Sequence, residues 1–298
     1  MWTELPYEDW KDTLDTLHMW MQIVGKVKLA LAPFINQWWE VAFYVTASGM
    51  TTGRIPFGSD IFQVDFDFLI HNLSIRTSNN QQKIISLENR PVAEFYKEFM
   101  DALTSLGIHV KINPVPVEVP NVIPFIKDTQ HASYDKDFVA RWWHILLQTS
   151  IVFDRFRSSF RGKSSPIQFF WGSFDLNGTR FSGKTATPPK MKGSMGKIMR
   201  FAENEENFAF GFWPGDQKLR HPAFYSYMYP TPKGMETIKL DKGISFNEQL
   251  GECILPYEII RKAASPEKNI LNFLETTYTE SAKLAEWDIQ SLQGKVPT

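Results

Sequence analysis

Residues 18–57 read HMWMQIVGKVKLALAPFINQWWEVAFYVTASGMTTGRIPF, and residues 144–183 read HILLQTSIVFDRFRSSFRGKSSPIQFFWGSFDLNGTRFSG. The two stretches align without a gap, and five of their forty positions are identical. The identical positions are His18 with His144, Gln22 with Gln148, Phe34 with Phe160, Phe43 with Phe169 and Arg54 with Arg180. Repetition at this scale bears on the whole fold. The sequence indicates two duplicated halves, and chance similarity is the alternative.

The composition is typical of a globular protein with a large core. The chain has 298 residues, 43% of them hydrophobic and 14% aromatic, which argues against disorder. The net charge is −1, so no overall field attracts nucleic acid or membrane. The longest apolar runs are shorter than the roughly 20 residues of a membrane span, and the first residues lack a signal-peptide pattern. A single cysteine, Cys253, favours a reducing compartment. We therefore expect a cytoplasmic protein that binds neither nucleic acid nor membrane.

The first half reads as a helix, four strands and a second helix. Apolar residues recur at helical spacing over residues 8–32, and Pro33 ends this helix. The runs WWEVAFYVTAS, IFQVDFDFLI, NLSIRT and KIISL are predicted strands. In the second run, alternation places five residues on one face: Phe62, Val64, Phe66, Phe68 and Ile70. Pro91 then opens a helix that Gly107 ends.

The second half repeats this order with an insertion. Residues 113–124 hold four prolines and are predicted to form an extended connector. Asp135 caps a helix that continues to about residue 160. PIQFFWGSFD and TRFSG are predicted to form a hairpin about Asn177-Gly178, and NFAFGFW and AFYSYMY are further strands. Residues 184–205 are a basic, Gly-rich insertion with at most a short helix, and the last helix starts at Ser265-Pro266.

These patterns predict an α+β fold with two similar α-β-β-β-β-α halves and mainly antiparallel sheet. The first half spans residues 7–112, the connector residues 113–134 and the second half residues 135–288. We expect them to form one compact unit. Whether the halves share one sheet, and whether the chain is oligomeric, stays open.

Four runs carry a resemblance to a known family: LPYEDWKDTLDTLHMWMQIVGKVKLALAP, WWEVAFYVTASGMTTGRIPFG, HASYD and FWGSFDLNGTRFSG. They resemble a bacterial family of uncharacterised proteins of about 300 residues, a domain of unknown function that covers nearly the whole chain. The resemblance implies a single bacterial, cytoplasmic unit without an established activity or assigned catalytic residues. Over Asn36–Val41, where the family has a histidine, this chain reads NQWWEV, so no role is expected for a histidine there.

Two histidine–glutamine pairs are candidates for binding a ligand. His18 and Gln22 are four residues apart on the first helix, and His144 and Gln148 are four apart on the second, so each pair shares a helix face. A pseudo-twofold axis would bring both pairs to a central cavity. The alternative is that His18 lies at the edge of the core and His144 on a solvated polar stripe.

Three other polar residues extend this candidate site. Arg54 and Arg180 occupy equivalent positions of the repeat and would supply positive charge to the same cavity. In HASYD, His131 precedes the helix that Asp135 begins, and a histidine beside a helix N-terminus can act as a general base. Ordinary capping of the helix explains this loop equally well.

Aromatic residues and the basic insertion point towards binding. In AFYSYMY, Tyr225, Tyr227 and Tyr229 point to one side of a strand, as in the wall of a ligand pocket or in plain sheet packing. The insertion, with Lys184 and four more basic residues, can act as a lid over an anion, or can simply be a solvated loop. No HExxH, paired CxxC, GxSxG or P-loop pattern occurs, so no metal site is expected and the sequence identifies no cofactor or catalytic residue.

Three functions are compatible with these observations. The first is a small-molecule-binding protein with an aromatic-lined cavity between the halves. The second is an enzyme that acts on a small anionic substrate with a histidine as general base. The third is a scaffold for protein interactions, which a flat, exposed apolar surface would favour. The sequence favours the first and leaves the ligand unidentified.

Overall fold

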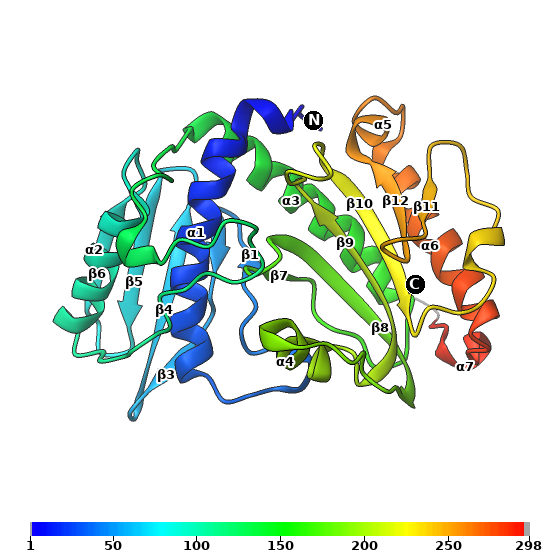
Figure 1. The fold of residues 1–298 in the computed structure, drawn as a ribbon, viewed down its shortest axis with the longest axis horizontal. Helices are drawn as coiled ribbons and strands as arrows, with labels where there is room; N and C mark the ends of the chain where they lie inside the picture. The colour runs from blue at the N-terminus through cyan, green and yellow to red at the C-terminus, as the bar shows by residue number, and fades with distance from the viewer. Residues whose placement is uncertain (1, 295–298) are drawn as a thin grey trace. The chain divides into compact units, whose positions relative to one another are not determined.

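The computed structural model describes residues 2–294 and has the predicted α+β fold with two similar halves (Figure 1). Within this range the chain forms two antiparallel sheets, each of six strands, and seven α-helices. The helices are α1 (Tyr7–Leu31), α2 (Val92–Ser105), α3 (Lys136–Ser158), α4 (Gly193–Ala202), α5 (Tyr257–Arg261), α6 (Pro266–Leu284) and α7 (Ile289–Leu292).

The chain divides into two compact units, each with its own internal contacts. The amino-terminal unit comprises Leu5–Leu147 and Phe169–Phe174. The carboxy-terminal unit comprises residues 2–4, Gln148–Gln168 and residues 175–294. The prolines of residues 113–124 belong to the amino-terminal unit, where they form neither helix nor strand.

The first sheet, in the amino-terminal unit, has the order β1-β2-β4-β5-β6, and β3 also pairs with β4. Its strands are β1 (Tyr44–Val45), β2 (Gly49–Thr51), β3 (Ile55–Phe57), β4 (Asp60–Asp67), β5 (Asn72–Thr77) and β6 (Gln82–Ser86). Strand β4 alternates as predicted, and its buried side chains form one face of the core. Helix α2 buries Val92, Phe95, Phe99 and Leu103 at helical spacing, and Phe95 stacks on Trp20 of α1 at 4.8 Å between ring centroids.

The segment Phe169–Phe174 is folded into the core of the amino-terminal unit. Phe174 stacks on Trp142 with 5.1 Å between ring centroids, and the Trp171 indole nitrogen donates to the Val41 carbonyl at 3.0 Å. The Trp171 ring passes so close to Gly25 of α1 that a β-carbon there would overlap it. The absence of a side chain at Gly25 therefore permits this packing.

The second sheet has the order β11-β12-β10-β9-β8-β7. Its strands are β7 (Gln168–Phe170), β8 (Asp175–Thr185), β9 (Glu205–Trp213), β10 (Ala223–Tyr229), β11 (Ser245–Asn247) and β12 (Glu252–Pro256). Strands β8 to β12 belong to the carboxy-terminal unit. One sheet face packs on helices: Phe156 of α3 lies edge-on to Phe210 at 5.0 Å, and Tyr278 of α6 contacts Phe208 at 5.4 Å between ring centroids.

Three local predictions are wrong. Asn177 and Gly178 lie inside β8 instead of at a hairpin turn, because the strand pairs continuously with β9 from Leu176 to Phe181. Most of WWEVAFYVTAS is not strand: a 3-10 helix spans Asn36–Trp38, strand β1 is limited to Tyr44–Val45, and Phe43 forms an isolated bridge with Phe169. Ile70 is 67% exposed, because β4 ends at Asp67 and the chain turns before it.

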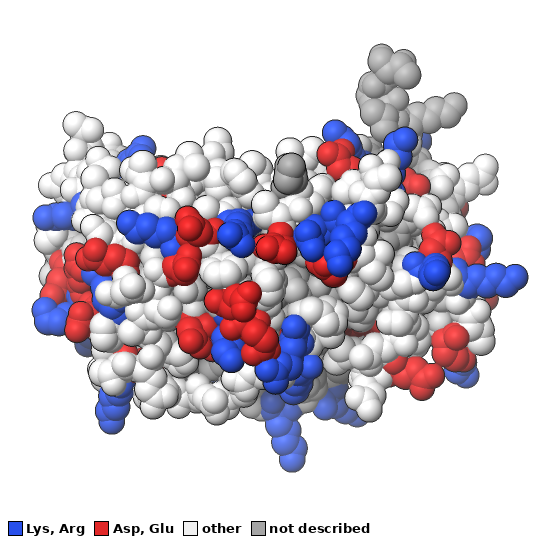
Figure 2. Space-filling view, turned by 90° about the horizontal axis from the view of Figure 1, so that it is seen from above, with Lys and Arg blue, Asp and Glu red and all other residues white. Residues whose placement is uncertain are grey.

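Charged side chains of both signs lie on the surface of the protein. Figure 2 shows acidic and basic side chains interspersed on the displayed face. Among the helices of residues 2–294, none combines the length and the apolar character that a membrane crossing requires.

Candidate functional site

Strand β10 carries a row of tyrosines on one face of the second sheet. Phe224, Ser226 and Met228 are buried against the helices, whereas Tyr225, Tyr227 and Tyr229 are half-buried on the opposite face. This is the one-sided placement that the alternation predicts. We call this surface the tyrosine face; it comprises the three tyrosines together with Asp175, Asn177, Glu203, Asn207 and Glu252.

Tyr225 reaches across β9 to polar groups on β8. Its hydroxyl donates to the Asp175 carboxylate and accepts from the Asn177 side-chain amide at 3.1 Å. Strand β9 lies between β10 and β8, and its residue Gly211 pairs with both Tyr225 and Asn177. A β-carbon at Gly211 would overlap the tyrosine ring. Gly211 therefore lets the ring lie across β9. Burial raises the pKa of Tyr225 well above its ordinary value, so the phenol stays protonated as a donor.

Tyr227 makes a second, parallel network. Its hydroxyl donates to Glu203 Oε1 at 3.2 Å, and the Asn207 amide donates to Glu203 Oε2 at 2.6 Å. Glu203 is only 3% exposed, and burial raises its pKa even though both hydrogen bonds oppose the shift. The rings of Tyr225 and Tyr227 stack with their centroids 6.3 Å apart.

Glu252 is the carboxyl group of the tyrosine face that lacks a partner. It lies on β12 two residues before Ile254, which pairs with Tyr225, so Glu252 shares the face of Tyr227. Within the described part of the chain, its half-buried side chain has no hydrogen bond or ion pair. Burial, together with the negative charge of Asp175, raises the pKa of Glu252 to about 7.

The tyrosine face can therefore hold a cation or exchange a proton. It presents the Glu252 carboxyl group near the buried carboxyl groups of Asp175 and Glu203, and a cationic ligand would offset both the burial and the negative charge that raise the Glu252 pKa. Aromatic rings beside carboxylates favour organic cations. A carboxyl group that titrates near neutral pH can also act as a general acid or base. Residues 2–294 contain no group of three or more His, Cys, Asp and Glu side chains placed to hold a metal ion.

Among the predicted residues, His18 and Gln22 do come together, in the amino-terminal unit. The Gln22 side-chain amide donates to the Val117 carbonyl, and the Gln22 side-chain oxygen accepts from the Val117 backbone amide, both at 2.8 Å. His18 Nε2 lies 3.0 Å from both Gln22 Nε2 and the Gly172 carbonyl, and one ring nitrogen satisfies only one of these contacts at a time. Burial lowers the pKa of His18 to about 4, so the ring is neutral. These contacts tie α1 to the Pro-rich segment and to Phe169–Phe174.

His131 belongs to the amino-terminal unit and forms an ordered pair with Asp128. Its Nδ1 lies 2.7 Å from Asp128 Oδ2, and the fully buried carboxylate also accepts from the backbone amides of Gln130 and His131. The His131 side chain is 25% exposed. The adjacent Asp15 has its pKa raised by burial, while His131 opposes the shift. Asp135 caps α3 through hydrogen bonds from the amides of Asp137 and Phe138, as predicted.

The other four predicted residues are dispersed. Arg54 is exposed in the loop between β2 and β3, and His144 is exposed on α3. Gln148 is half-buried on α3, and its side-chain oxygen has no hydrogen-bond partner. Arg180 is 3% exposed in the helix-covered core of the carboxy-terminal unit, where it donates to the Phe156 carbonyl and Ser159 Oγ and stacks over the Phe156 ring.

Sequence reasoning identified Tyr225 and Tyr227 but missed their acidic partners. The predicted hairpin puts Asn177 in the turn directly after Asp175, although the alternation of DLNGT along a strand was a usable signal. Glu203 lies in the predicted basic insertion, which contains the short helix α4, and its carboxylate, just after that helix, is the one that Tyr227 binds. Tyr229 donates to the Thr187 carbonyl at 2.6 Å, so the same insertion also contacts the tyrosine row.

Comparison with known proteins matches the chain to a family whose function is unknown. A family model described as "Family of unknown function (DUF5996)" matches residues 2–294. No curated protein and no solved structure matches the chain.

Proposed function

The chain belongs to this family of unknown function, and we propose that it binds a small molecule with a basic nitrogen on the tyrosine face. The observation that carries the proposal is Glu252, a half-buried carboxyl group without a partner beside Tyr227. A ligand ammonium group would give this carboxylate an opposite charge and would lower its pKa towards the ordinary range.

The neighbouring groups support the same ligand class. The hydroxyls of Tyr225 and Tyr227 donate hydrogen bonds to Asp175 and Glu203. The two stacked rings then form the wall of the proposed site. Tyrosine rings attract organic cations through their negatively charged faces. An anionic ligand would instead meet three carboxyl groups, so we propose a cation in place of the small anion that a histidine-based enzyme would need.

Thermal-shift assays with charge-matched small molecules test this proposal. We expect choline or putrescine to raise the melting temperature, and glycerol and citrate to leave it unchanged; a ligand at 100 times its Kd adds about 2.7 kcal/mol. The Glu252→Gln variant should lose the shift, whereas Glu248→Gln, an exposed residue on the preceding turn, should keep it. Equal shifts in both variants would contradict the proposal.

Proton exchange gives a second test of the same site. Since an ammonium group displaces the Glu252 proton, affinity for the amine should rise with pH and level off above about pH 7. Isothermal titration calorimetry in buffers of different ionisation enthalpy measures the proton release. In Glu252→Gln, amine binding should release no proton over this range.

A second candidate function rests on the Asp128–His131 pair. A buried carboxylate that fixes Nδ1 leaves Nε2 of the half-buried imidazole available as a general base, the arrangement found in hydrolytic enzymes. Hydrolysis of p-nitrophenyl acetate by the wild type and by His131→Gln tests it. A rate unchanged by the substitution would exclude this role.

We also propose that the protein acts in the bacterial cytoplasm and binds a metabolite instead of nucleic acid. Two features support this setting: the only cysteine, Cys253, is buried as a free thiol, and the chain carries a net charge of −1. Cell fractionation with an antibody against the protein tests the location.

A further inference from the structure

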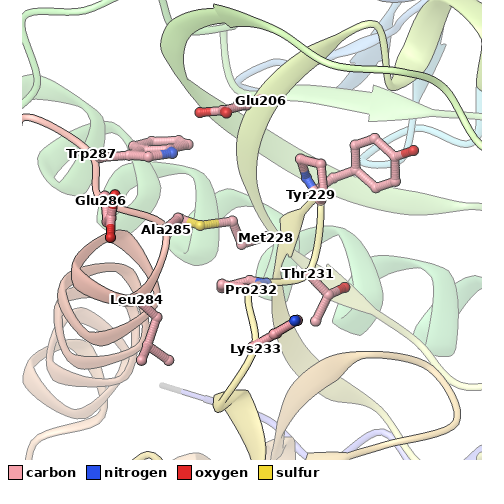
Figure 3. Close-up of a pocket in the computed structure, with 11 residues that line it drawn as sticks. Glu206, Met228, Tyr229, Thr231, Pro232, Lys233, Leu284, Ala285, Glu286 and Trp287 are labelled. Carbon is pink, nitrogen blue, oxygen red and sulfur yellow. The ribbon is translucent and has the colours of Figure 1, made fainter.

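A pocket of about 370 Å³ opens at the end of β10, within the carboxy-terminal unit (Figure 3). Its walls come from Glu206 on β9, from residues 228–233 at and after the end of β10, and from residues 284–287 at and after the end of α6. The volume lies in the range of small-molecule sites. The pocket is formed by other residues than the acidic side chains of the tyrosine face, although Tyr229 contributes to both.

Trp287 is fixed firmly in one wall. Its backbone amide donates to the Ala282 carbonyl at 2.9 Å, and its ring packs edge-on against Tyr278 with 6.1 Å between centroids. Only 5% of the residue is exposed. The indole orientation is therefore set by the core and does not depend on a ligand.

The Trp287 indole N–H is a buried donor that finds no acceptor in the described part of the chain. Figure 3 shows the nitrogen-bearing edge of the ring turned towards the space beside Glu206 and Met228. Leaving a buried donor unpaired costs free energy, and such exceptions in a folded protein call for an explanation. A ligand acceptor in the pocket supplies one.

Glu206 provides an acceptor on the same side of the pocket. Ser182 Oγ donates to its Oε2 at 2.8 Å, and Lys184 Nζ lies 4.0 Å from the same oxygen. Among residues 2–294, Oε1 has no hydrogen-bond partner. One side of the pocket thus offers an unused donor and an unused acceptor. Carboxylates cannot donate to Glu206, and ammonium groups cannot accept from the indole, but hydroxyl and amide groups do both.

The remaining walls favour an uncharged ligand with an apolar part. Met228, Pro232 and Leu284 supply apolar surface, and the prolines offer no backbone N–H. The nearest charges balance: Glu206 is close to Lys184, and Lys233 and Glu286 are both exposed at the pocket. No net charge therefore selects a charged molecule.

We infer that this pocket is a second ligand site, which takes an uncharged amide or alcohol whose polar group bridges the Trp287 indole and the Glu206 carboxylate. The site binds a different chemical class from the tyrosine face and does not depend on the amine proposal.

Three probes with a leucine side chain test the inference: N-acetyl-leucinamide, which is neutral, N-acetyl-leucine, which is anionic, and leucinamide, which is cationic. Calorimetric titration of the Glu252→Gln variant, in which the proposed amine site is disabled, should show that the neutral amide binds at least tenfold more tightly than either charged probe. Tighter binding of a charged probe, or no binding of the neutral one, overturns the proposal.

Trp287→Phe keeps most of the ring and removes only the N–H. Loss of one hydrogen bond predicts about tenfold weaker binding of N-acetyl-leucinamide. Trp2→Phe makes the same change at a residue outside the pocket and should leave the affinity unchanged. If both variants bind equally well, the indole is not a ligand contact and the proposal fails.

Nuclear magnetic resonance provides a readout that does not depend on the stability of a variant. The indole N–H signal of Trp287 is assigned as the one missing in Trp287→Phe. In the wild type, N-acetyl-leucinamide should move this signal downfield as the hydrogen bond forms. A signal that stays in place at saturating probe overturns the proposal.

Discussion

The polar groups around His18 and those around Tyr227 differ in what their side chains bind: the first bind mainly backbone groups, and the second bind one another. Gln22 uses its carbonyl oxygen and its amide on the Val117 backbone, and His18 fills the remaining space beside the Gly172 carbonyl. On the tyrosine face, Glu203 is fully engaged, but Glu252 has no partner. The first network links α1 to two other segments of its unit through backbone groups, whereas the second keeps one carboxyl group available for a ligand.

The largest expected effect comes from breaking the first network. Gln22→Ala removes both hydrogen bonds to Val117 and leaves the half-buried backbone amide and carbonyl of Val117 without their partner, so we expect a loss of about 3 kcal/mol in the free energy of unfolding. Urea denaturation measures it. Gln82→Ala, an exposed residue of β6, should change the same quantity by less than about 0.5 kcal/mol. A similar small loss in both variants would remove the structural role of Gln22.

The pH dependence of stability distinguishes the two networks by sign. Since the pKa of His18 falls to about 4 in the folded state, the unfolded chain binds a proton first as the pH drops. Lowering the pH from 7 to 5 should therefore reduce the free energy of unfolding by about 2 kcal/mol through His18. The wild type and His18→Gln are compared by urea denaturation at both pH values. His144→Gln, at an exposed position, should follow the wild type.

Glu252 should act in the opposite direction. Its pKa is raised to about 7 in the folded state, so the folded protein retains a proton that the unfolded chain releases. Stability should fall by about 1 kcal/mol from pH 6 to pH 8, and Glu252→Gln should lack this fall. Urea denaturation at the two pH values measures it. A wild type and variant with parallel profiles would show that Glu252 is not perturbed.

The smallest expected effect concerns a single hydroxyl on the tyrosine face. Tyr227→Phe removes one hydrogen bond to Glu203, which keeps the bond from Asn207, so a loss of about 1 kcal/mol is expected. The same substitution should weaken amine binding less than Glu252→Gln does, because the ring remains. If Tyr227→Phe weakens amine binding more than Glu252→Gln does, the ligand contacts the hydroxyl instead of the carboxylate.

Elements with a strong local pattern could be predicted from the sequence. The apolar spacing of α2, the alternation of β4 and the one-sided tyrosines of β10 are all properties of neighbouring residues. The hairpin at Asn177-Gly178 was wrong because pairing with β9 outweighed the local turn preference.

The site partners could not be predicted in the same way. Tyr227 meets Glu203 across 24 positions, and Gln22 meets Val117 across 95. Such contacts depend on sheet order and on the path of loops, which no local pattern in a single sequence contains. That Glu252 lacks a hydrogen-bond or ion-pair partner among the described residues is also visible only once the positions of all its neighbours are known.

The placement of Phe169–Phe174 sets an order for synthesis. These six residues complete the core of the amino-terminal unit, although residues on both sides of them belong to the other unit. A ribosome that makes the chain from its first residue must therefore translate through residue 174 before that core can close. No single cut in the chain releases either unit as an uninterrupted polypeptide.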